Sequence, residues 1–337
     1  MSALYVLAAD VGGTHTTVAL APTGDVRPAI VVESVYESQR SEALKPILES
    51  FLAKPEVKAH RSAVRAACLS VAGPVTMNSV TLTNLGWNVK GDALAVELGL
   101  PEVRLLNDFA AAGLGISRLS PAELETLQPG FPVAQGTRLI IGAGTGLGSG
   151  FLTARESGGY VAHASEAGHA DFAPLDDVQD KLLVYLRRAF GRVSYERVVS
   201  GPGLMRIFSF LQETGAGIPS KQLQEAARDN PDTSSVIGEF GLSKRDPLAV
   251  RALDLFASAY GAYAGNMALA TLPRGGVYLA GGIAPKLVGK LKDGTFVRAF
   301  NRKGRFADLL STIPIHVIMN PRVGLLGALH EAQRLVG

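Results

Sequence analysis

Short apolar runs that end in glycine-rich segments mark the first third of the chain. The run 4–9 predicts a strand, and the run 17–20 predicts its returning partner. Gly12 and Gly13, which lie between these runs, allow the positive φ that a tight hairpin needs, so we expect a glycine turn there. Further strands are expected at 29–35, 64–71 and 103–106, and helices at 41–53 and 92–98.

The remainder of the chain is mainly helical by the same criterion. Residues 117–136 are rich in loop formers and are expected to join two lobes. In the apolar segment 247–270, Ala257, Gly261 and Gly265 recur every four residues, which predicts a smooth stripe against which another element packs closely. Because strands are mixed with helices, the pattern predicts an α/β fold. The other expected helices are 178–190, 202–213, 221–228 and 325–335, and the other expected strands are 139–141, 277–280, 315–319 and a return strand that begins at 151.

Length and composition indicate a folded enzyme. A chain of 337 residues exceeds what one hydrophobic core usually serves, so two domains are expected. With 47% hydrophobic and 19% charged residues, the chain has the composition of a globular protein. The net charge of +3, from 33 basic and 30 acidic residues, does not suggest nucleic-acid binding.

The sequence also favours a reducing cytoplasm. Cys68 is the single cysteine, so no intramolecular disulfide is possible, and its apolar surroundings predict a core residue rather than a nucleophile. The first apolar stretch has no basic segment before it and is interrupted by Asp10, which argues against a signal peptide. The longest uncharged window, 255–273, contains several polar residues and predicts a buried helix rather than a membrane span.

The glycine runs do not fit the two commonest nucleotide motifs. A P-loop needs a lysine after its second glycine, and none of these runs supplies one. A dinucleotide fingerprint that starts at Gly142 and Gly144 would need its third glycine at Leu147. Hairpin turns can nevertheless bind phosphate, because successive backbone N–H groups point into one concavity.

Six segments follow one another along nearly the whole chain: DVGGT at 10–14, NDF at 107–109, GAGTGLG at 142–148, EAGHADFAP at 166–174, ERVVSGPG at 196–203 and GGVYLAGGI at 275–283. In this order they resemble the motifs of the bacterial glucokinases, which belong to the hexokinase–actin–Hsp70 superfamily. The resemblance implies a two-domain actin-like ATPase fold, also called ribonuclease H-like, with a cleft between a small and a large domain. It places residues 1–110 and 320–337 in the small α/β domain and 111–319 in the large one.

The resemblance also assigns roles to individual residues. It implies that Asp108 is the general base, since a carboxylate beside a sugar hydroxyl can accept its proton as the bond to phosphorus forms. It implies that Asp10 approaches the Mg²⁺ of ATP through water. The residues expected to hold sugar hydroxyls are Asn107, Asp108, Glu166, His169 and Glu196. Those expected at the nucleotide are Asp10, Val11, Gly12, Gly13, Thr14, His15, Gly144, Thr145, Gly146, Gly281 and Gly282.

Each of these residues also has an ordinary structural interpretation. Asp108 is a good N-cap for a helix that starts near Phe109, and Asp10 before glycine is a common turn residue. His169 alone suggests a structural histidine, Glu196 a solvated helix end, and Glu166 with His169 a metal pair without convincing further ligands. His15 departs from the family, in which asparagine commonly follows the glycine-glycine-threonine run.

The sequence therefore predicts the ATP-dependent phosphorylation of glucose to glucose 6-phosphate, with ATP and Mg²⁺. A kinase for another hexose or an amino sugar stays open, as does a sugar-sensing protein that has lost phosphotransfer, although Asp108 and Asp10 argue against the sensor. The zinc motif of the related ROK proteins cannot be built around Cys68 alone, and only nine residues precede Asp10, which argues against a DNA-binding repressor. The expected partners are glucose and ATP, with no nucleic acid and no membrane; a homodimer is a family expectation.

Overall fold

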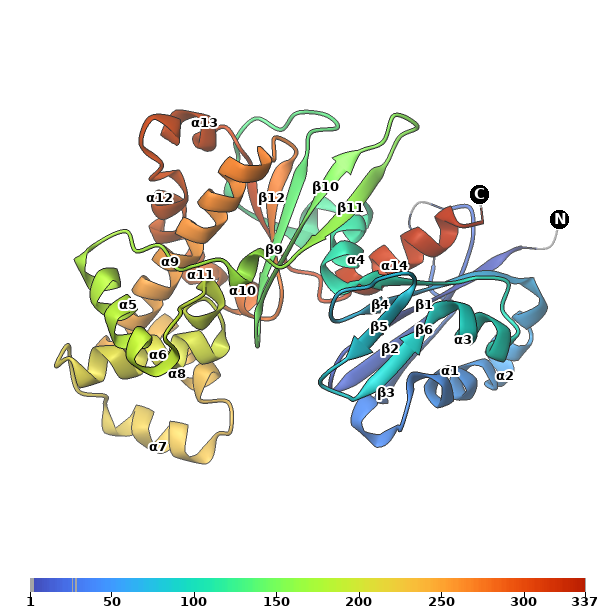
Figure 1. The fold of residues 1–337 in the computed structure, drawn as a ribbon, viewed down its shortest axis with the longest axis horizontal. Helices are drawn as coiled ribbons and strands as arrows, with labels where there is room; N and C mark the ends of the chain where they lie inside the picture. Colours follow the sequence, from blue (N-terminus) through green and yellow to red (C-terminus); the bar gives the residue numbers. More distant parts are fainter. Residues whose placement is uncertain (1–2, 26, 28, 337) are drawn as a thin grey trace. The chain divides into compact units, whose positions relative to one another are not determined.

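The computed structural model describes residues 3–25, 27 and 29–336, which fall into two units. The first unit comprises the chain up to Pro121, the segment Tyr160–Ala164 and the chain from Asn320 onward. The second comprises Ala122–Gly159 and Ser165–Met319 (Figure 1). The domain boundaries expected at 110/111 and 319/320 stay a prediction.

A five-stranded sheet with the order β3-β2-β1-β4-β7 is the frame of the first unit. Its central strand, β1, is antiparallel to β2 and parallel to β4, and β4 is parallel to β7. Successive residues of β1 are buried on opposite faces: Leu7 packs with α1 and α3, whereas Val6 packs with α14. Covering on both faces explains why β1 is an unbroken apolar run. The strands are β1 (Tyr5–Val11), β2 (His15–Pro22), β3 (Val32–Glu37), β4 (Val64–Val71) and β7 (Val103–Asn107).

The other elements of the first unit lie around this sheet. The hairpin β5–β6 was not expected from the sequence, and the strand expected at 29–35 is shifted to 32–37. Cys68 is fully buried in β4, and burial raises the pKa of its thiol well above the usual value, so the expectation of an inert core cysteine is confirmed. These elements are η1 (Ser38–Arg40), α1 (Leu44–Leu52), α2 (Pro55–Lys58), η2 (Arg61–Ala63), β5 (Ser79–Leu82), β6 (Trp87–Lys90), α3 (Gly91–Leu98), α4 (Asp108–Gly115), η3 (Ile116–Arg118) and α14 (Val323–Arg334).

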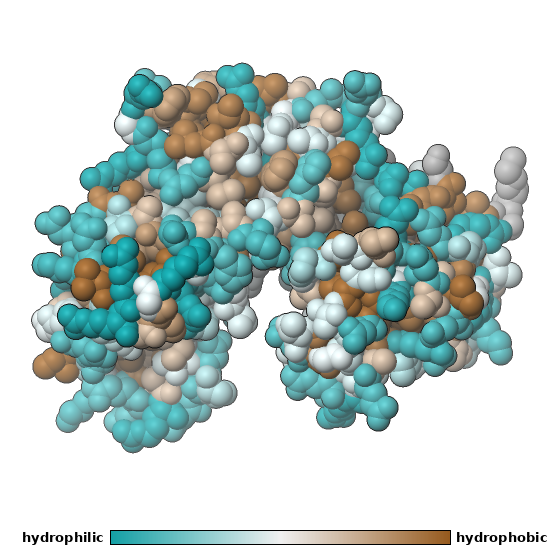
Figure 2. Space-filling model, in the orientation of Figure 1, coloured by the Kyte–Doolittle hydropathy of each residue, from teal (hydrophilic) through white to brown (hydrophobic). Residues whose placement is uncertain are grey.

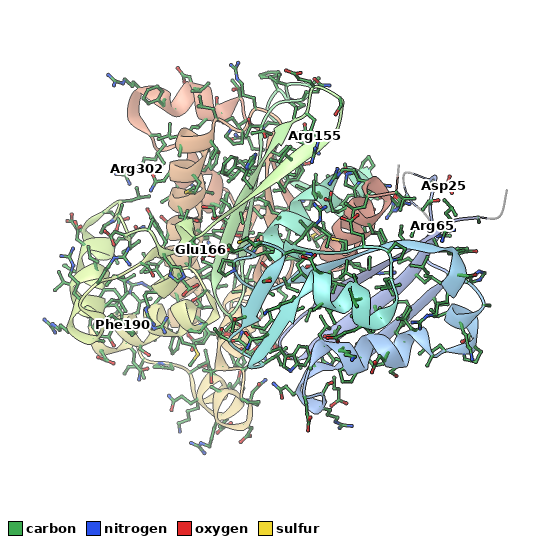
Figure 3. The ribbon with its side chains drawn as sticks, turned by 45° about the vertical axis from the view of Figure 1, so that its right-hand side comes forward. Asp25, Arg65, Arg155, Glu166, Phe190 and Arg302 are labelled. Carbon is green, nitrogen blue, oxygen red and sulfur yellow. The ribbon has the colours of Figure 1, made fainter. Side chains whose placement is uncertain are left out.

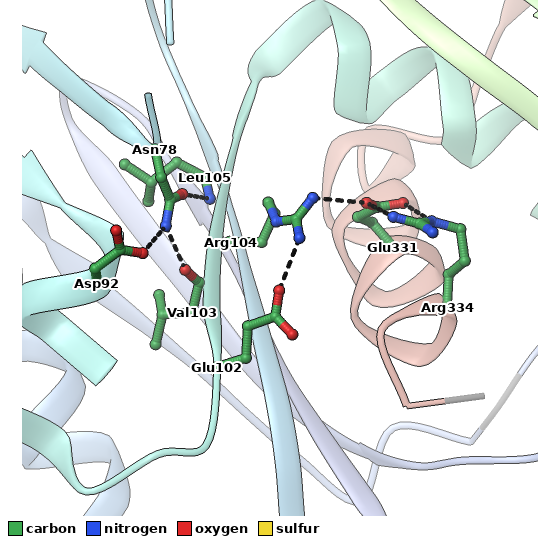
Figure 4. A network of polar contacts seen from close by, with 8 residues as sticks. All are labelled: Asn78, Asp92, Glu102, Val103, Arg104, Leu105, Glu331 and Arg334. Carbon is green, nitrogen blue, oxygen red and sulfur yellow. Dashed lines mark hydrogen bonds and ion pairs between the residues drawn. The ribbon is translucent and has the colours of Figure 1, made fainter. Parts of the chain in front are cut away.

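The edge strand β7 is held by polar contacts that no neighbouring strand supplies (Figure 4). The amide of Asn78, a residue with φ of 55°, accepts from the Leu105 N–H and donates to the Val103 carbonyl, both at 2.8 Å. Two β-ladder positions of the open edge are thereby satisfied by one side chain.

Arg104 fixes the same strand to α14. Its guanidinium pairs with Glu102 at 2.8 Å and lies 4.0 Å from Glu331, a buried carboxylate that also pairs with Arg334 at 2.6 Å (Figure 4). The strand β7 ends at Asn107, and the following residue, Asp108, begins α4.

A six-stranded mixed sheet has the order β11-β10-β9-β12-β13-β8, and its strands β8, β9, β10, β12 and β13 belong to the second unit. Residues 117–136, which were expected to join two lobes, contain the boundary between the units at Pro121 and Ala122. They also contain the strand β8, which was not expected and pairs antiparallel with β13. Only one residue of β8 is buried, so this strand lacks the apolar alternation by which a strand is recognised. The strands are β8 (Leu124–Gln128), β9 (Arg138–Ala143), β10 (Leu147–Ala154), β11 (Tyr160–Ser165), β12 (Gly276–Ala280) and β13 (Ile315–Ile318).

Helices make up most of the rest of the second unit. On α7 only Leu223 is buried, and the surface over this helix is hydrophilic in Figure 2. Within residues 3–25, 27 and 29–336, none of the helices combines the length and apolar character needed to cross a membrane. The helices are η5 (Ala167–His169), α5 (Asp177–Phe190), η6 (Tyr195–Arg197), α6 (Gly201–Glu213), α7 (Lys221–Asp229), α8 (Thr233–Leu242), α9 (Pro247–Thr271), α10 (Ile283–Lys286), α11 (Val288–Leu291), α12 (Thr295–Asn301), η7 (Gly304–Phe306) and α13 (Ala307–Ser311), with η4 (Pro121–Glu123) at the junction.

The small-residue stripe predicted on α9 is confirmed. A Cβ added to Gly261 would lie 2.1 Å from the Phe296 carbonyl oxygen, and one added to Gly265 would lie 2.4 Å from that of Phe300. Both carbonyls belong to α12, which therefore packs against the stripe at main-chain distance.

Gly261→Ala should lower the free energy of unfolding by about 1–3 kcal/mol, because α12 must move to admit the methyl group. The matched control is Gly238→Ala in α8, where the nearest atom to the new Cβ, Leu287 Cδ2, is at 3.6 Å. That change should be neutral or stabilising by up to about 1 kcal/mol, since alanine is the better helix former. Urea denaturation of both variants tests the pair, and equal effects would contradict the close packing of α9 on α12.

Candidate active site

The first glycine turn joins β1 to β2, as predicted. The Gly12 N–H donates to the His15 carbonyl at 2.9 Å and closes the turn. The expected reason for the glycines is wrong, because neither Gly12 nor Gly13 has a positive φ. A Cβ on Gly12 would lie 2.9 Å from the His15 carbonyl oxygen, so the turn requires the missing side chain for space.

Ser38, which the sequence analysis did not identify, fixes this turn through hydrogen bonds to its carbonyl groups. Its Oγ donates to the Gly12 carbonyl at 2.8 Å, and its N–H donates to the Thr14 carbonyl at 2.8 Å. Its Oγ also lies 2.9 Å from Thr16 Oγ1, and both side chains are fully buried. With these carbonyls tied to Ser38, the turn has a fixed shape.

The residues expected to bind nucleotide at this turn are not equivalent. The Val11 side chain is buried in the core, so only its main chain is available to a ligand. Thr14 and His15 are exposed. The contribution of the His15 ring stays a prediction.

Asp10 lies at the end of β1, partly buried beside β4. Ser70 Oγ donates to Asp10 Oδ1 at 2.8 Å, and a Cβ on Gly324 of α14 would lie 3.2 Å from Oδ2. Burial raises the pKa of Asp10, and the hydrogen bond from Ser70 opposes this rise. A carboxylate whose charge is poorly solvated gains from a nearby cation, and its oxygens are the ligand type that Mg²⁺ prefers, so Asp10 fits the metal role.

Asn107 and Asp108 follow one another at the end of β7. The N-cap of α4 is Asn107 and not Asp108, since Asn107 Oδ1 accepts from the N–H groups of Phe109 at 3.0 Å and Ala110 at 3.2 Å. The Asn107 amide also donates to the Gly73 carbonyl at 3.1 Å, which leaves one amide hydrogen for a sugar.

Asp108 is the first residue of α4 and is partly buried. Its Oδ1 accepts from the Phe109 N–H at 2.9 Å. The start of a helix favours a negative charge, which is the state a general base needs before it accepts a proton.

The second glycine turn, Gly144-Thr145-Gly146, joins β9 to β10. The Gly144 N–H donates to the Gly146 carbonyl, and the Gly201 N–H at the start of α6 donates to the Gly144 carbonyl, both at 2.8 Å. The structure thus brings two motifs that are far apart in the sequence, 142–148 and 196–203, into contact.

The end of β12 meets the same turn. Gly281 has φ of 79°, and a Cβ on it would lie 2.6 Å from the Ala143 carbonyl oxygen, so glycine is required there for close approach. Gly282 has open space beside it and lines a cavity of about 730 Å³ together with Gly144 and Thr145. The second glycine turn and the segment after β12 therefore share one cavity, to which Gly282 contributes directly.

Sequence reasoning missed most of the lining of this cavity. Ser234 at the start of α8, Met205 on α6 and Lys286 on α10 belong to it. Asp232 also lines it and caps α8, accepting from the Ser235 N–H at 3.1 Å. Only the serine and aspartate of this cap leave a signal in the sequence, and that signal predicts a helix start rather than a binding site.

Three residues expected at the sugar lie together in the second unit. Glu166 follows the end of β11 (Figure 3), and its Oε2 lies 4.0 Å from His169 Nε2. His169 Nδ1 lies 4.0 Å from Glu196 Oε1, so the imidazole is between two carboxylates. Glu166 and His169 are exposed. Throughout the described part of the chain, no three His, Cys, Asp or Glu side chains are arranged to hold a metal ion.

Glu196 also contacts the end of the second glycine turn, and no sequence pattern predicts this contact. Its Oε2 accepts from the Leu147 N–H at 3.0 Å. Two segments that separately resembled sugar and phosphate motifs thus share one carboxylate.

A cavity of about 730 Å³ at a glycine turn, with two carboxylates and an imidazole clustered beside the turn, is the arrangement expected of a sugar kinase of the actin-like ATPase fold. The family model described as glucokinase matches residues 7–335, and the glucokinase of Nostoc punctiforme is 42% identical over 98% of this chain and 99% of its own. The chain belongs to the glucokinase family.

Solved structures agree in fold. A glucokinase from an Antarctic psychrotroph superposes with a TM-score of 0.82 at 26% identity, covering 97% of this chain and 99% of that one. A ROK family glucokinase from Streptomyces griseus, solved with glucose and AMPPNP, has a TM-score of 0.62 at 20% identity, covering 98% of this chain and 99% of that one.

Asp10→Asn should raise the thermal stability of the nucleotide-free and Mg²⁺-free protein at pH 8. Because the pKa of Asp10 is raised in the folded state, protonation of Asp10 stabilises the fold. This contribution to the free energy of unfolding is complete below the ordinary pKa of 3.8 and is lost as pH rises through the raised pKa. Asparagine removes the buried charge and can still accept from Ser70. The gain over the wild type should therefore shrink as pH falls towards 3.8.

Unfolding curves between pH 8 and pH 4.5 test this dependence, with Asp25→Asn at an exposed aspartate as the control. A gain that is the same at every pH, or one that the control reproduces, would contradict the burial effect.

Proposed function

We propose that this glucokinase-family protein transfers the γ-phosphate of ATP to glucose, giving glucose 6-phosphate and ADP, with Asp108 as general base. The observation that carries the proposal is in the second unit, where the glycine turn lines the cavity suited to a nucleotide and also contacts Glu196 of the sugar cluster. The proposed phosphate-binding turn and the proposed sugar-binding cluster are thereby joined by a hydrogen bond between the Leu147 main chain and the Glu196 side chain.

Each group of residues has one task in this mechanism. Glu166, His169 and Glu196 accept from or donate to the sugar hydroxyls and orient the hexose, and Asn107 contributes its remaining amide hydrogen. Asp108 accepts the proton of the attacking hydroxyl while the new oxygen–phosphorus bond forms. The bond between the γ-phosphorus and the bridging oxygen breaks, and ADP leaves with that electron pair.

The backbone N–H groups of the two glycine turns bind phosphate oxygens. Asp10 would hold Mg²⁺ through water; when bound, this ion neutralises charge on the phosphates. We further propose that the protein acts in the cytoplasm, and a homodimer remains a family-based proposal.

A panel of sugars tests the proposed reaction. ADP release should be fastest with glucose. Faster ADP release with another hexose or with an amino sugar would identify that sugar, and not glucose, as the substrate. Glucose binding without ADP release under any condition would instead identify a sensor and refute the kinase.

Asp108→Asn should lower kcat by roughly 10²- to 10⁴-fold while leaving glucose affinity nearly unchanged, because the amide keeps the shape but cannot accept the proton. Asp177→Asn is the matched control, since Asp177 is likewise the first residue of its helix, α5. Steady-state kinetics with calorimetric glucose binding separate the two effects. A kcat within a factor of about two of the wild type would remove Asp108 from the chemistry.

A further inference from the structure

We propose that Glu196 couples the two substrates: it is both a sugar ligand and the residue that positions the phosphate turn, so that hexose binding and nucleotide binding strengthen each other through this one carboxylate. The inference rests on the proposed function and deepens it, because it assigns a route of communication between the two parts of the site.

The two oxygens of Glu196 face different neighbours. Oε2 accepts from the Leu147 N–H at 3.0 Å, and a Cβ on Gly146 would lie only 2.6 Å from it. Oε1 is 4.0 Å from Nδ1 of His169. One carboxylate therefore touches the end of the glycine turn with one oxygen and belongs to the sugar cluster with the other.

The main chain around Glu196 reinforces this link. Ser200 Oγ donates to the Glu196 carbonyl at 2.7 Å, and the next residue, Gly201, donates its N–H to the Gly144 carbonyl at 2.8 Å. The segment 196–201 thus contacts the turn at both ends, at Gly144 and at Leu147.

The segment 166–174, which holds Glu166 and His169, also packs against Leu147. A Cβ on Gly168, between Glu166 and His169, would lie 1.8 Å from the Leu147 carbonyl oxygen. The peptide groups of Leu147 are consequently held between both sugar-binding segments, one of them through a hydrogen bond and the other through direct packing.

The sign of the coupling follows from charge. The Glu196 carboxylate lies beside a turn that binds an anion, so its negative charge opposes phosphate binding. A sugar hydroxyl that donates to Oε1 offsets part of that charge and fixes the carboxylate, and with it the direction of the Leu147 N–H. Glucose should therefore raise the affinity for nucleotide, and linkage requires that nucleotide raise the affinity for glucose by the same factor.

The test measures the Kd of AMPPNP by calorimetry with and without saturating glucose in the full-length protein. We expect the wild type to bind AMPPNP at least about fivefold more tightly with glucose, the lower end of usual coupling factors. Glu196→Ala should bring this ratio close to one. Glu166→Ala is the matched control: it weakens glucose binding, but it keeps the Leu147 contact and should keep the ratio once glucose is saturating.

Hydrogen exchange of the segment 144–148 provides a second measurement that does not need sugar. Without ligands, Glu196→Ala should speed the exchange of the Leu147 amide by roughly tenfold or more, since a hydrogen bond to a charged acceptor is lost. Glu196→Gln should restore protection, because its amide oxygen can accept from Leu147, and Glu166→Ala should match the wild type.

The outcomes are distinguishable from failure of the proposed reaction. Absence of ADP release by the wild type with every sugar refutes the kinase itself. Normal turnover by the wild type, combined with an unchanged ratio in Glu196→Ala or with unchanged Leu147 exchange, overturns the coupling role alone.

Discussion

The second unit depends on main chain packing against main chain around one glycine turn. The turn can lie against β12 only because Gly281 has no side chain to collide with the Ala143 carbonyl, and against η5 only because Gly168 has none to collide with Leu147. Main-chain groups held in this way have few alternative positions, so their N–H groups remain directed as the fold sets them. Preorganised N–H donors of this kind stabilise charge that develops during phosphoryl transfer without reorganising.

The first glycine turn is held in place mainly by hydrogen bonds from side chains. Ser38 and Thr16 form a buried hydroxyl pair behind it, and Ser70 fixes Asp10 beside it. Burial makes the charged form of Asp10 unfavourable, and in the proposed mechanism a Mg²⁺ ion held through water would offset this cost. The buried hydroxyl of Ser38 fixes the Gly12 carbonyl by a hydrogen bond and adds no charge beside the first glycine turn, which we propose binds anionic phosphate.

Much of this arrangement could be predicted from the sequence, because motif, periodicity and position agree. The glycine turns lie after their apolar strands, and the stripe of Gly261 and Gly265 marks where α12 packs. The family and the fold follow from motifs in order, each of which carries little weight alone.

The rest depended on geometry that the sequence does not encode locally. Asn107 and Asp108 are both good helix caps, and only the backbone conformation decides that Asn107 caps α4. The contact of Glu196 with Leu147 spans 49 positions and has no pattern of its own. Asn78 takes the place of a further strand at the edge of β7 from the tight turn 76–79, which hydrogen bonds between Thr76 and Ser79 close; Met77 in this turn also has a positive φ, and the turn contains no glycine.

The sharing of Glu196 has a consequence for how sugar preference can diverge within such a scaffold. In the proposed mechanism, a substitution of Glu196 changes a sugar ligand and also removes the hydrogen bond to Leu147 at the second glycine turn, so a substitution that favours a new sugar would also weaken nucleotide binding. Glu166 and His169 are exposed and do not carry that second duty in hydrogen bonding to the turn. On this mechanism, sugar preference can change through Glu166 and His169 with less effect on nucleotide binding than through Glu196.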